Sequence, residues 1–99
     1  MPELPAAASS HERLRAAVAA DRHRIAAGDR PTYHVLWAPA NDGSIDVTVR
    51  ELPLIHQYVP DEASVLDGAR FLIARTLDVE PTAFDVKPGA IPGGPPTAR

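Results

Sequence analysis

Four histidines give this chain its widest choice of chemistry, because an imidazole can bind a metal, exchange a proton or contact a partner near neutral pH. His11 and His23 lie twelve residues apart on one predicted helix. Their side chains differ by about 120° around its axis, so they cannot share a metal ion. His34 and His56 lie on predicted strands without a third ligand beside them. We therefore expect no metal and no cofactor, and interpret the histidines as surface or partner-contact residues.

The residues that nucleophilic and nuclease enzymes use are absent or scattered. The chain has no Cys, which excludes cysteine nucleophiles, thiolate zinc sites and disulfides. Its serines fall at predicted caps, turns and helix positions, outside any nucleophile-elbow pattern. Two-metal cleavage of RNA needs clustered carboxylates, and Asp46 and Asp85 have no convergent third acid. The sequence therefore indicates a binding protein rather than an enzyme.

Charge is divided unevenly along the chain. The 99 residues carry a net charge of −3 at pH 7; residues 1–30 hold five bases and four acids, and residues 31–99 hold five bases and nine acids, a net charge of −4. This balance argues against a surface devoted to nucleic acid and suits a basic partner. No segment approaches the roughly 18 apolar residues of a membrane span, and no secretory leader is visible. We expect no membrane contact and a cytoplasmic location.

A helix is predicted over residues 9–28. Ser9 and Glu12 have the capping-box spacing, and Gly28 suits the left-handed residue that ends many helices. Its large apolar residues form a narrow stripe, which predicts that the helix docks on another surface: Leu14, Val18 and Ile25. Four arginines flank the stripe on its two sides: Arg13 and Arg24 on one, Arg15 and Arg22 on the other. Such arginines are typical of a docking helix; the alternative is a small nucleic-acid-binding regulator that uses them for contact.

Residues 32–38 and 44–50 are predicted to form a β-hairpin, because both alternate in hydrophobicity and residues 39–43 have turn chemistry. Pairing Ala38 with Ser44 predicts three pairs on one apolar face: Trp37–Ile45, Val35–Val47 and Tyr33–Val49. This assigns Trp37 to the core. The other face is mixed and carries His34 and Leu36, which is typical of an antiparallel sheet covered on one side.

The rest of the chain predicts a third strand over 54–59, a second helix over 61–77 and a brief fourth strand over 84–87. Asp61 is the expected N-cap of this helix. One side of the helix is apolar, and Val65 and Leu72 widen it; its central residues are Ala63, Leu66, Ala69, Ile73 and Leu77. The order predicts a two-layer α+β domain over 32–87, a three- to four-stranded antiparallel-type sheet with one helix on its apolar face. Residues 1–8 and 88–99 are expected to be disordered.

Several short features follow one another between residues 33 and 87: Tyr33 and Val35; Gly43; Ile45, Val47 and Val49; Glu51-Leu52-Pro53; Gln57; Asp61-Glu62-Ala63; Ala69-Arg70; Ile73-Ala74; Leu77-Asp78-Val79; and Phe84-Asp85-Val86. In this order they resemble the HicB-like antitoxin family, in particular its short actinobacterial members. The resemblance implies a β-β-β-α-β fold, a truncated relative of the ribonuclease H arrangement. It also implies a role in a toxin–antitoxin system, neutralising HicA, a small messenger-RNA-cleaving toxin.

The chain departs from that family pattern in three places. Leu54 stands after Pro53 where the family usually has Gly, so the turn there is expected to differ. No DNA-binding segment follows the domain, which leaves DNA binding open. The N-terminal helix is an addition on which the resemblance is silent.

The mixed sheet face and the segment 51–54 are the predicted contact surface for the toxin. The candidate contact residues are His34, Leu36, Glu51, Leu54, His56 and Tyr58. Tyr58 is the first to test, because Tyr is enriched at binding hot spots. Leu36 and an uncovered edge strand also predict a homodimer or a higher homo-oligomer.

Overall fold

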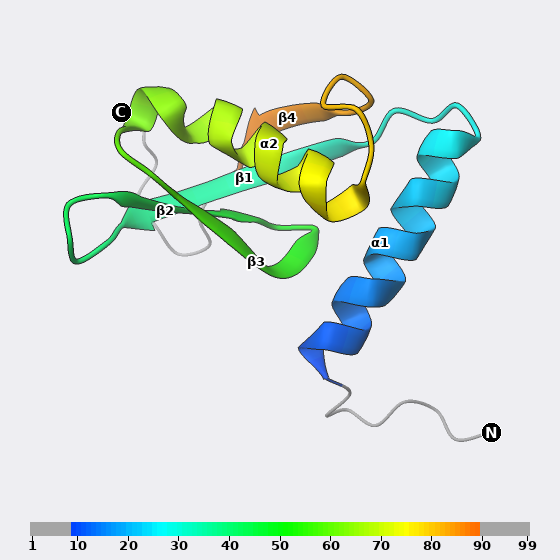
Figure 1. Cartoon of the computed structure of the whole chain (residues 1–99), viewed down its shortest axis with the longest axis horizontal. Coiled ribbons are helices and arrows are strands. Elements are labelled where there is room, and N and C mark those ends of the chain that lie inside the picture. The colour runs from blue at the N-terminus through cyan, green and yellow to red at the C-terminus, as the bar shows by residue number, and fades with distance from the viewer. Residues whose placement is uncertain (1–8, 90–99) are drawn as a thin grey trace.

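The computed structural model describes residues 9–89, so the expectations for residues 1–8 and 90–99 lie outside the described range. The elements follow in the order α1 (Ser10–Ala26), β1 (Thr32–Pro39), β2 (Ile45–Val49), β3 (Leu52–Val59), the 3₁₀ helix η1 (Glu62–Ser64), α2 (Val65–Leu77) and β4 (Asp85–Pro88) (Figure 1). The predicted α+β class and the β-β-β-α-β order behind an N-terminal helix are confirmed. Pro88 belongs to β4, so it is not part of the tail to which the sequence assigned it.

The four strands form one mixed sheet in the order β3-β2-β1-β4. β1 pairs with β2, and β2 with β3, in antiparallel fashion as predicted, whereas β4 pairs parallel to β1. The parallel pair arises because the chain leaves β3 at one edge, crosses the sheet through α2 and re-enters at the other edge. Such a crossover brings the last strand back in the direction of β1.

The hairpin register differs from the predicted one by two residues. Trp37 pairs with Val47 and Val35 with Val49. The ladder extends further toward the turn than expected, since the Ala40 N–H donates to the Ser44 carbonyl at 2.9 Å. Because side chains alternate with a period of two, a shift of two residues changes the pairs and keeps the faces. The predicted apolar and mixed faces are therefore right, and the predicted pairs are wrong.

The core lies between α2 and one face of the sheet. Its fully buried large side chains are Tyr33, Phe84, Leu52, Ile73, Leu77, Val35, Val47 and Val65. Leu66 is 37% exposed and Ala63 is exposed, contrary to the prediction, because the helix starts with a tighter 3₁₀ turn and Val65 takes the inward position. Trp37 is only partly buried against the core, at the hairpin end.

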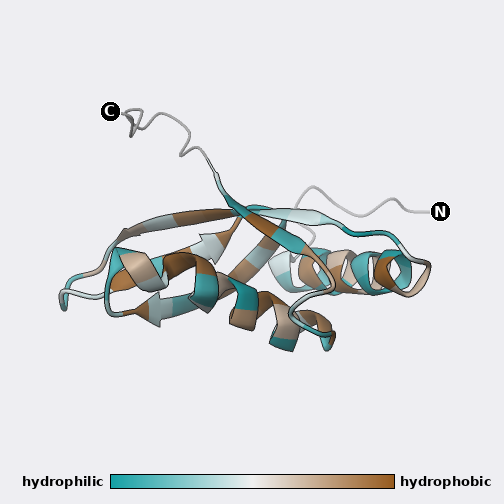
Figure 2. Cartoon of the chain, turned by 90° about the horizontal axis from the view of Figure 1, so that it is seen from above, coloured by the Kyte–Doolittle hydropathy of each residue, from teal (hydrophilic) through white to brown (hydrophobic). Residues whose placement is uncertain are grey.

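Helix α1 docks on the same side of the sheet as α2, as its apolar stripe predicts (Figure 2). Leu14, Val18 and Ile25 pack against the core cluster, and the predicted capping box is present. The Tyr33 hydroxyl donates a hydrogen bond to the Asp21 carboxylate at 2.6 Å, which joins β1 to α1. Burial, and then this hydrogen bond, raise the pKa of Tyr33, so the phenol remains the donor.

Candidate protein-binding face

The face of the sheet turned away from α2 carries no packed helix or strand of residues 9–89. The strand register arranges its side chains in rows: Leu36 lies beside Thr48, which lies beside His56, and Asp46 lies beside Tyr58. Neighbouring strands are about 4.8 Å apart, so the side chains of both rows lie close enough together to contact one docked protein. We term this surface the open face and define it by His34, Leu36, Asp46, Thr48, His56 and Tyr58.

His34 and Glu51 form the tightest polar contact of the open face. The His34 ring Nδ1 lies 2.6 Å from Glu51 Oε2, and the His34 backbone N–H donates to Glu51 Oε1 at 2.8 Å. Arg50 Nη2 lies 3.5 Å from the same carboxylate. Burial alone would raise the pKa of Glu51, but the two hydrogen bonds from His34 outweigh it and hold the pKa of that carboxyl below its ordinary value. Glu51 is thereby kept ionised and fixed in orientation.

His56 and Tyr58 form an exposed aromatic pair on β3. Their rings meet edge to face with centroids 5.3 Å apart, and Tyr58 is 53% exposed. The His56 ring Nδ1 lies 3.2 Å from Asp46 Oδ1 on β2, which holds the imidazole in place. Fixed aromatic side chains with a polar atom lose little conformational entropy on binding, which suits a protein contact.

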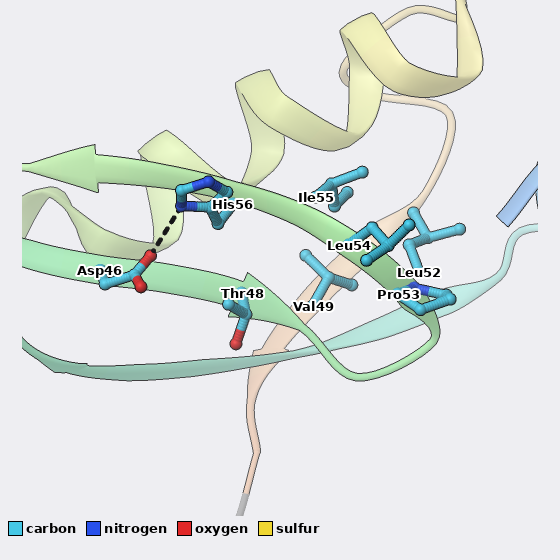
Figure 3. A pocket seen from close by; sticks show the side chains of 8 residues that line it. All are labelled: Asp46, Thr48, Val49, Leu52, Pro53, Leu54, Ile55 and His56. Carbon is cyan, nitrogen blue, oxygen red and sulfur yellow. Dashed lines mark hydrogen bonds and ion pairs between the residues drawn. The ribbon is translucent and has the colours of Figure 1, made fainter. Parts of the chain in front are cut away.

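A shallow hollow of about 360 Å³ opens beside this pair, where β3 departs from regular pairing. The register jumps from Thr48–His56 to Val49–Leu52, so residues 53–55 bulge from the ladder. Figure 3 shows the Asp46 carboxylate reaching the His56 ring at one end of the hollow, with Leu54 toward the other. Bulges of this kind often lie beside functional sites.

Leu54 is 51% exposed and has a φ of 77°, a left-handed conformation that glycine adopts without strain. The leucine therefore adopts a backbone angle that is ordinarily occupied by glycine. Pro53 fits the same segment because β3 is an edge strand, where a missing N–H does not break a central ladder.

All six predicted contact residues thus lie on one side of the sheet or at its margin. His34, Leu36, His56 and Tyr58 belong to the open face by register, Glu51 bonds to His34, and Leu54 lines the hollow. Leu36 is less accessible than expected, because the chain at Gly89 lies against it. The sequence places Asp46 and Thr48 on this mixed face as well, but the list of predicted contact residues left both out.

The four arginines of α1 are exposed, as both interpretations of them require. Two of them already have partners within the chain. Arg24 forms ion pairs through Nη1 with Asp21 Oδ1 at 3.3 Å and through Nε with Asp29 Oδ2 at 3.8 Å. Arg13 donates a hydrogen bond to the Ser10 hydroxyl. The remaining two are Arg15 and Arg22. The helix therefore offers a weaker electrostatic surface for nucleic acid than its count of arginines indicates.

Two further observations bear on what the described part of the chain can do. Within residues 9–89, no three metal-ligating side chains lie close enough together to hold an ion. Neither helix in this range has the length and apolar character that crossing a bilayer requires.

Comparison with models of known families, with curated proteins and with solved structures gives no match for this chain. The resemblance to HicB-like antitoxins therefore stays a prediction from the sequence.

Proposed function

We propose that this chain is a HicB-like antitoxin, a cytoplasmic protein-binding module that neutralises a small basic ribonuclease of the HicA type. The observation that supports this best is that all six predicted contact residues lie on the open face or at its margin. That face presents an exposed aromatic pair, His56 and Tyr58, beside a hollow and carboxylates with fixed geometry. These are the features of a protein contact with a central anchor and a polar rim.

Charge supports the same type of partner. Residues 31–99 carry a net charge of −4, and Asp46 and Glu51 stand at the open face. A ribonuclease that grips RNA presents a positive surface to the phosphates. An acidic inhibitor is attracted to that same positive surface and covers it. The surface that binds the inhibitor is therefore the surface that would bind RNA.

The decisive experiment is co-expression with the product of the adjacent gene, which the proposal predicts to be a small basic protein. We expect a complex in pull-down and rescue of growth when the neighbour alone is toxic. Raising the salt concentration should slow association much more than it speeds dissociation, because rim charges steer the encounter. The absence of both complex and rescue would contradict the proposal.

Substitutions on the open face locate the contact. Tyr58→Ala and His56→Ala should each weaken the complex by about tenfold or more, the usual effect of truncating an aromatic anchor. Arg22→Ala, an exposed change on α1, is the matched control and should leave the affinity for the toxin unchanged.

A gel-shift assay with promoter DNA tests the alternative function. Specific retardation of the DNA by the chain alone, lost in Arg15→Ala and Arg22→Ala, would instead favour a regulator that uses the arginines of α1: Arg13, Arg15, Arg22 and Arg24.

A further inference from the structure

The most exposed large apolar side chain in the described part of the chain lies far from the open face. Phe71 is 69% exposed on α2, whose opposite side packs on the sheet. It borders a hollow of about 260 Å³ that Asp67, Arg70 and Pro81 also line. Arg70 is held there by hydrogen bonds to the carbonyls of Pro81 and Phe84. A rigid hollow beside an exposed aromatic ring is the shape of a hot-spot contact.

The charges around Phe71 are arranged symmetrically and with opposite signs. Asp67 lies four residues before Phe71 and Arg75 four residues after it, and both are exposed. At 100° per residue the three side chains follow one stripe, with Asp67 and Arg75 about 12 Å apart along the helix axis. That separation prevents them from pairing with each other. Neither forms an ion pair within residues 9–89.

We propose that this stripe (Asp67, Phe71 and Arg75) binds a second copy of the chain, with two α2 helices packed antiparallel about a two-fold axis at Phe71. The two-fold brings Asp67 of each copy opposite Arg75 of the other, so both charges gain a partner. Each Phe71 ring enters the hollow of the other copy. The stripe is therefore self-complementary, as an isologous dimer contact must be.

This contact goes beyond the proposed function and uses a different surface. The sequence predicts dimerisation through Leu36 and an edge strand on the open face, whereas α2, which carries the stripe on its exposed side, packs on the opposite face of the sheet (Figure 2). Helix α2 has 13 residues, a length of about 20 Å. A contact of that size is below the standard interface of roughly 1,600 Å², which is typical of weak and transient association.

Sedimentation equilibrium of the purified chain, from micromolar to sub-millimolar concentration, tests the proposal. The average mass should rise from one chain to two. Phe71→Ala should raise the dissociation constant by about tenfold or more. Tyr58→Ala, which removes an exposed aromatic ring from the open face, should leave it unchanged. A monomer throughout, or a dimer lost in Tyr58→Ala and kept in Phe71→Ala, would overturn the proposal.

Charge reversal tests the antiparallel arrangement. Asp67→Arg and Arg75→Asp, made singly, place like charges opposite one another and should each weaken the dimer. The double variant D67R/R75D restores opposite signs and should recover it. Mixing the two single variants should give a heterodimer for the same reason. All these positions are exposed, and circular dichroism checks that each variant folds. Failure of both recoveries would overturn the two-fold arrangement.

Discussion

Leu54 combines three properties at one residue: a left-handed backbone, an exposed apolar side chain and a place at the rim of the hollow. A non-glycine residue in this conformation costs about 1 kcal/mol or more. Strain of this kind persists where the surrounding fold imposes it, and it is common at binding sites. In the proposed antitoxin, contacts between the Leu54 side chain and the toxin offset this strain in the complex, whereas nothing offsets it in the free chain.

Replacing this leucine separates its two roles. Leu54→Gly should stabilise the free chain by about 0.5–1 kcal/mol, because the relief of strain exceeds the added entropy of the unfolded glycine. Thermal unfolding measures the gain. Leu54→Ala is the matched control: it keeps the Cβ and the strain and should give no gain. Both variants should bind the toxin more weakly. A glycine variant no more stable than the alanine variant would contradict the argument.

Glu51 makes stability depend on pH at one identifiable group. Its pKa lies below the ordinary value of 4.5, so ionised Glu51 stabilises the folded chain above pH 4.5. That contribution is lost as the pH falls through the folded pKa. Glu51→Gln should cost about 1 kcal/mol at neutral pH, since neutral hydrogen bonds to His34 replace charge-assisted ones. Denaturant unfolding from pH 7 to 3 should show the two stabilities converging. If the stabilities of the wild type and Glu51→Gln differed by the same amount at every pH in this range, Glu51 would not be the source of the pH dependence.

At the scale of elements, the contact between α2 and β3 is set by a glycine. A Cβ added at Gly68 would lie 2.6 Å from Val59 Cγ1, too close for any real contact. The helix therefore approaches the strand more closely than any side chain allows. Gly68 lies inside the second predicted helix, where glycine is normally unfavourable.

Gly68→Ala should accordingly destabilise the chain by roughly 1–3 kcal/mol, although alanine is the better helix former by about 1 kcal/mol. Val59→Ala removes the obstructing methyl groups. The double variant should be more stable than the sum of the two single effects by about 1 kcal/mol. Urea unfolding of the wild type, the two single variants and the double variant gives the four stabilities of this double-mutant cycle. Additive effects would show that the helix simply shifts away from the strand.

The same scale shows what the sequence alone can predict. Alternation and capping signals are local, so the faces of the hairpin and the N-cap of α1 at Ser9 are predicted correctly. The register depends on how tightly the turn closes, and the direction of β4 depends on a crossover. Neither leaves a local signal. The bulge at residues 53–55 was signalled only by Pro53, and nothing in the pattern indicates a left-handed leucine. The open face was therefore predicted as a surface, without its hollow.

At the scale of the whole molecule, the two proposed contacts lie on opposite sides of a two-layer fold. The open face is on the sheet, and the stripe of Asp67, Phe71 and Arg75 is on the outer side of α2. Helix α1 closes one end of the core between them without covering either surface. Binding at one surface therefore need not disturb the other.

This separation predicts the composition of the complex with the proposed toxin partner. At concentrations at which the free chain is dimeric, the complex should contain two copies of each protein. Phe71→Ala should reduce it to one copy of each without changing the affinity of a single site, because the ring is remote from the open face. Tyr58→Ala should bind the toxin about tenfold or more weakly and keep the dimer. Light scattering gives the masses, and titration calorimetry gives the affinities. A wild-type complex with one copy of each protein would show that the toxin and the second copy compete, and would contradict the assignment of two independent surfaces.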